Sequence, residues 1–146
     1  MKNLLFLFVA GVFLLSGCGS DDDSTPSGSF NVEAKIDGVD WSGAGNTVVT
    51  VAAGQTITAV GAGREDGSAF ALTFMSGTTG TYDLANFATY VDPARTVYTA
   101  TSGTITVTEF TESSISGTFS FSASNLAGAG SVEITQGKFT NVNVMR

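Results

Sequence analysis

The chain has 146 residues, of which 13% are charged, and a formal net charge of −7 at pH 7. This length suits a single domain, and so acidic a chain repels the phosphate backbone, which excludes nucleic-acid binding. It contains no histidine and one cysteine, Cys18. Histidine-dependent nucleophile activation, thiolate zinc sites and an internal disulfide are therefore excluded as well.

The N-terminus begins with a short apolar segment. Lys2 precedes twelve residues without a polar side chain, Leu4–Leu15, and the small residues Ser16 and Gly17 follow. Twelve helical residues span about 18 Å, too little for a hydrocarbon core of about 30 Å. A positive start, a short apolar stretch and small residues are typical of a secretory signal peptide, which we expect over residues 1–17.

The lone cysteine comes at the end of that segment, in Leu15-Ser16-Gly17-Cys18. These four residues resemble the lipobox of bacterial lipoproteins, in which cleavage falls just before the cysteine. The resemblance implies that Cys18 carries a diacylglyceryl group on its thiol and a further acyl chain on its amine, so that the lipid-bearing N-terminus binds a membrane. The alternative is an ordinary secreted protein with a free or disulfide-linked Cys18.

Residues 18–29 contain the lipid acceptor followed by an acidic and serine-rich run with no hydrophobic residue. Such a run cannot bury apolar area, so we expect a disordered tether. Asp21, Asp22 and Asp23 resemble the signal that directs lipoproteins of Bacteroidota to the outer leaflet of the outer membrane, which implies surface exposure. The alternatives are a plain spacer and a protein that faces the periplasm. Calcium is disfavoured, because a mobile run lacks the spaced oxygens of a rigid loop.

From Phe30 the pattern has period two. Apolar residues alternate with polar ones over Phe30–Ile36, which predicts a half-buried strand, and Asp37-Gly38 then predicts a two-residue hairpin turn. Such a turn places Val39 opposite Ile36 and Trp41 opposite Ala34. The sole tryptophan is therefore expected in the core rather than on a sugar-binding surface.

Residues 30–146 are expected to form one all-β domain, a single antiparallel β-sandwich or, alternatively, a β-barrel. Three Gly-Ala-Gly motifs, which we call the glycine triplets, lie at 43–45, 61–63 and 128–130. They lack the lysine and the following helix of a phosphate-binding loop and are interpreted as turns. Further strands are expected at Thr47–Ala52, Gln55–Val60, Phe70–Met75, Thr81–Leu84, Thr89–Val91, Thr96–Ala100, Gly103–Phe110, Ser114–Ala123, Ser131–Thr135 and Lys138–Val144.

The clearest hairpin joins "SGTITVTEF" to "SGTFSFSAS". Burying Ile105 on the first strand and Phe119 on the second on the same side requires odd residues to face odd residues. We therefore expect a connection of three or five residues around Glu112. The opposite faces form a wall of hydroxyl side chains directed at water: Thr104, Thr106, Thr108, Thr118, Ser120 and Ser122.

Several of these segments, among them "FNVEAKIDGVDW", "YTATSGTITVTEF", "ISGTFSFSA" and "VEITQGKFTNVNV", are similar to a family of uncharacterised Bacteroidota lipoproteins defined as a domain of unknown function. The resemblance covers most of residues 30–144. It implies a β-domain held at the outer membrane, and it brings no catalytic or binding residues with it.

Two kinds of residue remain as candidates for chemistry. Tyr82, Tyr90 and Tyr98 lie in one region and are possible ligand contacts, or else they cap the core with their hydroxyl groups in water. Paired carboxylates would suit a glycosidase, but most fall at turns or outward strand positions, where solvated charge explains them. The carboxylates of the domain are Glu33, Asp37, Asp40, Glu65, Asp66, Asp83, Asp92, Glu109, Glu112 and Glu133.

These observations favour a non-enzymatic, lipid-anchored cell-surface protein that binds a glycan or an envelope protein. The alternative is a passive structural component of the envelope. An enzyme that acts on polysaccharide with a carboxylate pair is the third hypothesis. No catalytic, cofactor-binding or metal-binding residue is predicted, and no cofactor is expected.

Overall fold

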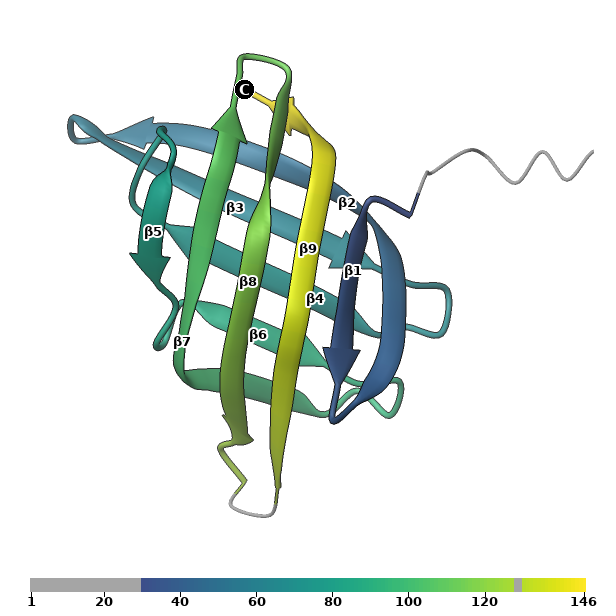
Figure 1. Cartoon of the computed structure of the whole chain (residues 1–146). Helices are drawn as coiled ribbons and strands as arrows, with labels where there is room; N and C mark the ends of the chain where they lie inside the picture. The colour runs from purple at the N-terminus through teal and green to yellow at the C-terminus, as the bar shows by residue number, and fades with distance from the viewer. Residues whose placement is uncertain (1–29, 128–129) are drawn as a thin grey trace, which may run out of the picture.

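The computed structural model describes residues 30–127 and 130–146. The predicted signal peptide, the lipid attachment at Cys18 and the tether with Asp21, Asp22 and Asp23 lie outside the described residues. Every regular element in the described part is a strand (Figure 1), which confirms the all-β class. The strands are β1 (Val32–Ile36), β2 (Val39–Ala52), β3 (Gln55–Gly63), β4 (Ala69–Phe74), β5 (Gly80–Asp83), β6 (Ala88–Val91), β7 (Val97–Phe110), β8 (Ser114–Asn125) and β9 (Ser131–Met145).

Eight strands close into a barrel, the stated alternative to a sandwich. The order is β7-β6-β4-β3-β2-β1-β9-β8, and β8 pairs back onto β7. Two long strands each pair with two neighbours in turn along their length: β2 pairs first with β1 and then with β3, and β7 pairs first with β6 and then with the short β5. Past Gly43, which faces the first residue of β1, β2 pairs directly with β9, in parallel.

Two of the glycine triplets are not turns, so that interpretation is wrong for them. Residues 43–45 lie inside β2 and residues 61–63 inside β3, where the two triplets face each other with Ala44 opposite Gly63. A Cβ atom at Gly43 would lie 2.5 Å from the Trp41 ring, and one at Gly45 would lie 2.6 Å from a methyl group of Val32. These glycines permit close packing inside the barrel. In the third triplet, residues 128 and 129 lie outside the described residues.

The predicted hairpin between β1 and β2 is confirmed. Asp37 and Gly38 both have positive φ, 49° and 84°, as the two central residues of a type I′ turn require. Ala34 faces Trp41, and the tryptophan is 4% exposed. A local turn signal therefore places the indole inside the barrel.

The β7–β8 hairpin buries the predicted side chains, but its register next to the connection differs from the predicted one. The strand bounds leave three residues in the connection, as expected, yet next to it Phe110 faces Ile115, an even residue opposite an odd one. A bulge between Val107 and Glu109 restores the odd register, so that Ile105 faces Phe119 and both are buried. The predicted hydroxyl wall is exposed or half-buried on the outside.

The interior is filled by apolar side chains from all the barrel strands, with aromatic rings at its centre. The Phe70 ring lies 4.6 Å from the Trp41 ring, edge to face, and 5.0 Å from the Tyr90 ring. Phe119 and Phe121 contact Phe70 from the opposite side of the barrel. Packing of this kind leaves the outer surface and the two ends of the barrel as places for binding.

One buried polar atom in this interior has no partner among the described residues. Thr47 on β2 is fully buried, and its Oγ1 makes no hydrogen bond. Thr58 on β3 is equally buried, but its Oγ1 donates to the carbonyl oxygen of Ser76 at 2.6 Å. The two threonines form a matched pair for mutation.

We expect Thr47→Val to raise the free energy of unfolding by about 1 kcal/mol, because valine keeps the shape and removes an unsatisfied hydroxyl group. Thr58→Val removes a satisfied hydroxyl group and is expected to cost about 1 kcal/mol. Urea unfolding of the three proteins measures both changes. Equal losses in the two variants would contradict this interpretation of Thr47.

Candidate functional site

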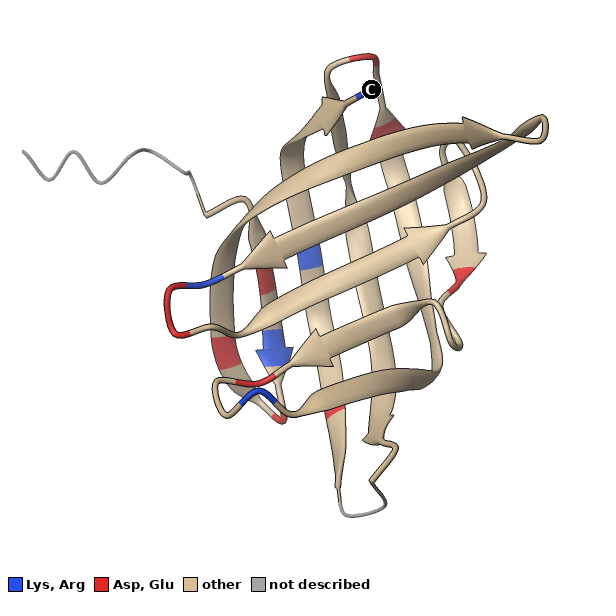
Figure 2. Ribbon diagram, turned by 180° about the vertical axis from the view of Figure 1, so that it is seen from behind, with Lys and Arg blue, Asp and Glu red and all other residues tan. Residues whose placement is uncertain are grey.

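Charged residues gather at one end of the barrel and on the adjoining β1–β2 hairpin (Figure 2). Ten of the fifteen charged residues in the described part belong to this group, which we call the charged end. In contrast, residues 41–63 and 67–82, which form most of β2, all of β3 and β4, carry no charge. The charged end consists of Glu33, Lys35, Asp37, Asp40, Arg64, Glu65, Asp66, Asp92, Arg95 and Glu133.

Four segments that are distant in sequence meet there. The backbone N–H of Glu133 on β9 donates to Oδ1 of Asp37 in the β1–β2 turn at 2.8 Å. The guanidinium group of Arg95, in the β6–β7 loop, lies against Gly67 in the β3–β4 loop, where a Cβ would meet it at 3.4 Å. The charge cluster is thus a product of barrel closure.

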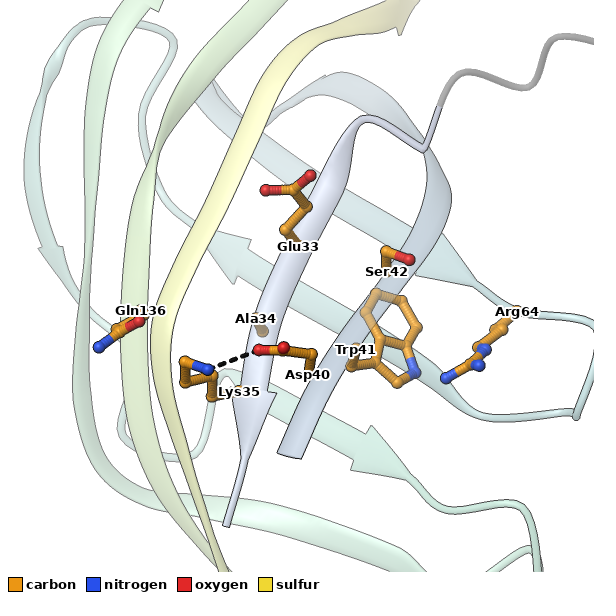
Figure 3. A pocket seen from close by; sticks show the side chains of 8 residues that line it. All are labelled: Glu33, Ala34, Lys35, Asp40, Trp41, Ser42, Arg64 and Gln136. Atoms are coloured by element: carbon orange, nitrogen blue, oxygen red, sulfur yellow. Dashed lines mark hydrogen bonds and ion pairs between the residues drawn. The ribbon is translucent and has the colours of Figure 1, made fainter. Parts of the chain in front are cut away.

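A hollow of about 430 Å³ lies beside the β1–β2 hairpin at this end, and Trp41 is one of its lining residues (Figure 3). We call it the Trp41 hollow. Lys35 on β1 and Asp40 on β2 face each other across the hairpin and form an ion pair, and Arg64 approaches from the end of β3. The lining residues are Glu33, Ala34, Lys35, Asp40, Trp41, Ser42, Arg64 and Gln136.

A chain of polar contacts ties the indole to the β3–β4 loop. Trp41 donates from Nε1 to Oγ of Ser68 at 2.7 Å, and the Ser68 hydroxyl group donates in turn to Oδ1 of Asp66. The other carboxylate oxygen of Asp66 lies 3.7 Å from Nε of Arg64. The loop is therefore fixed relative to β2 through a buried side chain.

The hydrogen bond from the Ser68 hydroxyl group lowers the pKa of Asp66, with smaller contributions from the Ser68 backbone N–H and from Arg64. An ionised carboxylate accepts hydrogen bonds, whereas a general acid needs a raised pKa. Asp40 is committed to its ion pair with Lys35. The arrangement is better suited to holding a charged or polar partner than to transferring protons.

The sign of the pH effect at Asp66 follows from the lowered pKa. Its charge stabilises the fold fully above the unfolded-state value of 3.8, and this contribution is lost as the pH falls through the lower folded-state pKa. We expect the stability difference between the wild type and Asp66→Asn to be constant from about pH 7 to about pH 5 and to shrink by about pH 2.5. Urea unfolding at these pH values measures it. A difference that grows on acidification would contradict the assignment, and Glu112→Gln, at the opposite end, is the control.

The three tyrosines predicted as ligand contacts are divided between two places. Tyr90 and Tyr98 face each other on β6 and β7, whereas Tyr82 on β5 faces Ile105, farther along β7. The Tyr82 ring stacks on Phe74 at 4.9 Å. The structure therefore does not bring all three into one site, and their role in ligand binding stays a prediction.

Tyr90 nevertheless lies next to the charged end. It is 4% exposed, and burial, with a further contribution from Asp92, raises the pKa of its hydroxyl group. Tyr98 stacks on it at 6.1 Å. Of the three tyrosines, Tyr90 alone lines a hollow shared with Trp41 and Arg64.

Gln136 is a site residue for which the sequence carries no local signal. It lies at a bulge in β9 with φ of 50°, a conformation that glutamine rarely adopts. It borders both the Trp41 hollow and a second hollow of about 370 Å³ over the hydroxyl wall, beside Thr118 and Lys138. Bulges and strained residues are frequent at binding sites, where they redirect a side chain.

The described residues contain no group of three or more acidic, histidine or cysteine side chains placed to hold a metal ion. Residues 30–127 and 130–146 also contain no helix with the length and hydrophobicity needed to cross a bilayer.

A family model described as a domain of unknown function (DUF6252) matches residues 22–143. The chain belongs to this family. The match begins within the acidic run and extends through β1 almost to the end of β9, so the DUF6252 domain includes nearly all of the barrel. No curated protein and no solved structure matches the chain.

Proposed function

We propose that this DUF6252 chain is a non-enzymatic lipoprotein of the Bacteroidota outer membrane that is anchored through Cys18 and displays its barrel at the cell surface as a binding module. The lipobox pattern supports the lipid anchor, and the acidic run after it supports the location at the cell surface. The convergence of ten charged residues from four separate segments at the charged end, four of which line the Trp41 hollow, supports the binding role. Charge placed for solubility alone would be spread over the surface.

The partner we propose is a protein rather than a glycan. Proteins that hold sugars stack them on open aromatic faces, but Trp41 is 4% exposed and packs against Phe70. The Tyr82 ring is likewise stacked on Phe74, and the Tyr90 ring packs against Phe70. Mixed charge around a shallow hollow suits the polar contacts of a protein surface.

Two observations support a non-enzymatic role over a glycosidase. The lowered pKa of Asp66 keeps its carboxyl group ionised, and Asp40 is paired with Lys35. Asp66 is therefore not available as a proton donor at neutral pH, and Asp40 is held by its partner across the hairpin. A passive envelope component is the second candidate, favoured by the hydroxyl wall on β7 and β8, which resists aggregation without needing a ligand.

Binding by the full chain in detergent micelles to an array of envelope proteins and to a glycan array tests the proposal. We expect capture of at least one envelope protein, with capture weakened by Glu65→Lys at the charged end. Glu112→Lys, at the far end of the barrel, is the matched control and should leave binding unchanged. Capture of glycans alone would contradict the protein partner, and no binding to either array would favour the passive role.

A further inference from the structure

The first half of β2 has a free edge. Val39–Gly43 pairs with β1 on one side, but pairing with β3 on the other side begins at Ala44, opposite Gly63. Among the described residues no strand pairs with this second edge of Val39–Gly43. At this point the chain leaves β3 through Arg64, whose side chain lies beside the edge in Figure 3.

The hairpin register shows which backbone groups this edge presents. Ile36 and Val39 flank a two-residue turn and form a hydrogen-bonded pair. Antiparallel pairs alternate, so Asp40, opposite Lys35, directs its N–H and C=O away from β1, and Ser42 does the same. The backbone N–H and C=O groups of the even-numbered residues of β2 pair with β3 as far as Ala44. Those of Ser42 and Asp40 continue the same edge but have no strand opposite them.

A hollow of about 190 Å³ lies along this edge, and we call it the edge groove. Apolar side chains line part of it, including Val39, which is 69% exposed, and Tyr90. Arg64 also borders the groove, but its side chain is 46% exposed and lies 3.7 Å from Asp66. So weak a surface contact leaves Arg64 free to move aside.

The net charge around the edge groove determines which kind of segment can bind there. Seven acidic residues and three basic ones make up the charged end. A cationic segment is attracted there. A second copy of the chain would bring Asp40 close to another acidic end, and the acidic run Asp21–Asp23 of the tether carries the same sign, so both are disfavoured.

We infer that the free edge of β2 accepts an extended, positively charged segment of a partner protein, which pairs with Asp40 and Ser42 as an added strand. This inference rests on the proposed function and names the part of the partner that is recognised. Alternation of side chains along the added strand places apolar residues over the edge groove and basic residues toward the carboxylates. Main-chain hydrogen bonds supply affinity, and the groove supplies selectivity.

Peptides provide the test, with the full chain in detergent micelles. The probe is an end-blocked peptide of about eight residues with alternating lysine and valine, enough to cover the edge at about 3.4 Å per residue. Trp41 is the sole tryptophan, so its fluorescence reports binding. Hydrogen exchange measured by mass spectrometry over residues 39–43 reports strand pairing. We expect binding, with exchange of this segment slowed about tenfold or more.

Two further peptides separate strand pairing from charge attraction. The same lysine–valine sequence with every backbone amide methylated keeps its charge but cannot donate, and we expect it to bind about tenfold more weakly or worse. A glutamate–valine peptide should not bind. In the protein, Ser42→Pro removes the outward N–H without touching the β1 ladder and should weaken binding similarly, whereas Ser42→Ala should not. The methylated peptide decides the question even if Ser42→Pro fails to fold.

The outcomes distinguish this inference from the proposed function. Equal binding of the methylated peptide, or no peptide binding while an envelope protein is still captured at the charged end, would overturn strand addition alone. Failure of peptides and arrays together would overturn both. A dimer in solution with residues 39–43 protected, or faster exchange of that segment after deletion of residues 19–29, would show another occupant and also overturn the inference.

Discussion

Gly103→Ala is expected to lower the free energy of unfolding by about 3–5 kcal/mol, the largest stability loss we foresee for one added methyl group. Gly103 on β7 has φ of 145°, which disfavours any residue with a Cβ. The added Cβ would lie 2.3 Å from Cβ of Phe121 and 2.4 Å from the carbonyl oxygen of Ser120, both on β8. Since β7 and β8 close the barrel, neither strand can move away without loss of other pairs.

Guanidinium chloride unfolding measures this change. Ser102→Ala, one residue earlier at an exposed position, is the matched control and should shift the free energy of unfolding by less than about 0.5 kcal/mol. A loss of under about 1 kcal/mol for Gly103→Ala would show that the close approach of β7 and β8 is wrong.

Cys18→Ala is expected to move the protein completely from the detergent phase to the aqueous phase in phase partitioning of whole cells. Each buried methylene group of an acyl chain contributes about 0.8 kcal/mol, and two or three chains anchor a protein stably where one does not. Ser20→Ala, which leaves the lipobox intact, should partition like the wild type. Unchanged partitioning of Cys18→Ala would contradict the lipid anchor.

Replacement of Asp21, Asp22 and Asp23 with alanine tests export to the cell surface separately from the lipid anchor. We expect the variant to stay in the detergent phase but to resist protease added to intact cells, because the barrel would then face the periplasm. Digestion as fast as that of the wild type would show that the acidic run is a spacer without a role in export.

The features that the sequence could predict depend on neighbouring residues. Asp37-Gly38 determines a two-residue turn through the positive φ of both residues, and this turn places Trp41 opposite Ala34. The alternation on β7 and β8 likewise predicts an apolar inner face and a hydroxyl outer face. In both cases one turn or one period carries the information.

Barrel closure could not be predicted in the same way, because it depends on contacts between distant residues. Gly43 looks like a strand break in the sequence, yet it lies within β2, where it makes room for the ring of Trp41 and the carbonyl oxygen of Gly63. The bulge between Val107 and Glu109 carries no local signal either. A sandwich and a barrel therefore fit the same strand pattern.

The candidate site was beyond prediction for the same reason. Trp41, Arg64 and Asp92 are separated by more than twenty residues each, and barrel closure brings their segments to one end. The free edge of β2 exists because β3 ends at Gly63, before it has paired with Ser42. Strand ends are the least certain feature of any prediction from sequence.

A light-activated crosslinking residue in intact cells tests most directly whether the charged end is the binding surface. It is placed at position 65, where Glu65 is exposed in the β3–β4 loop, or at position 50, where Thr50 is exposed on the uncharged part of β2. We predict a discrete crosslinked adduct from position 65 and none from position 50. No adduct from position 65, or the same adducts from both positions, would contradict the account.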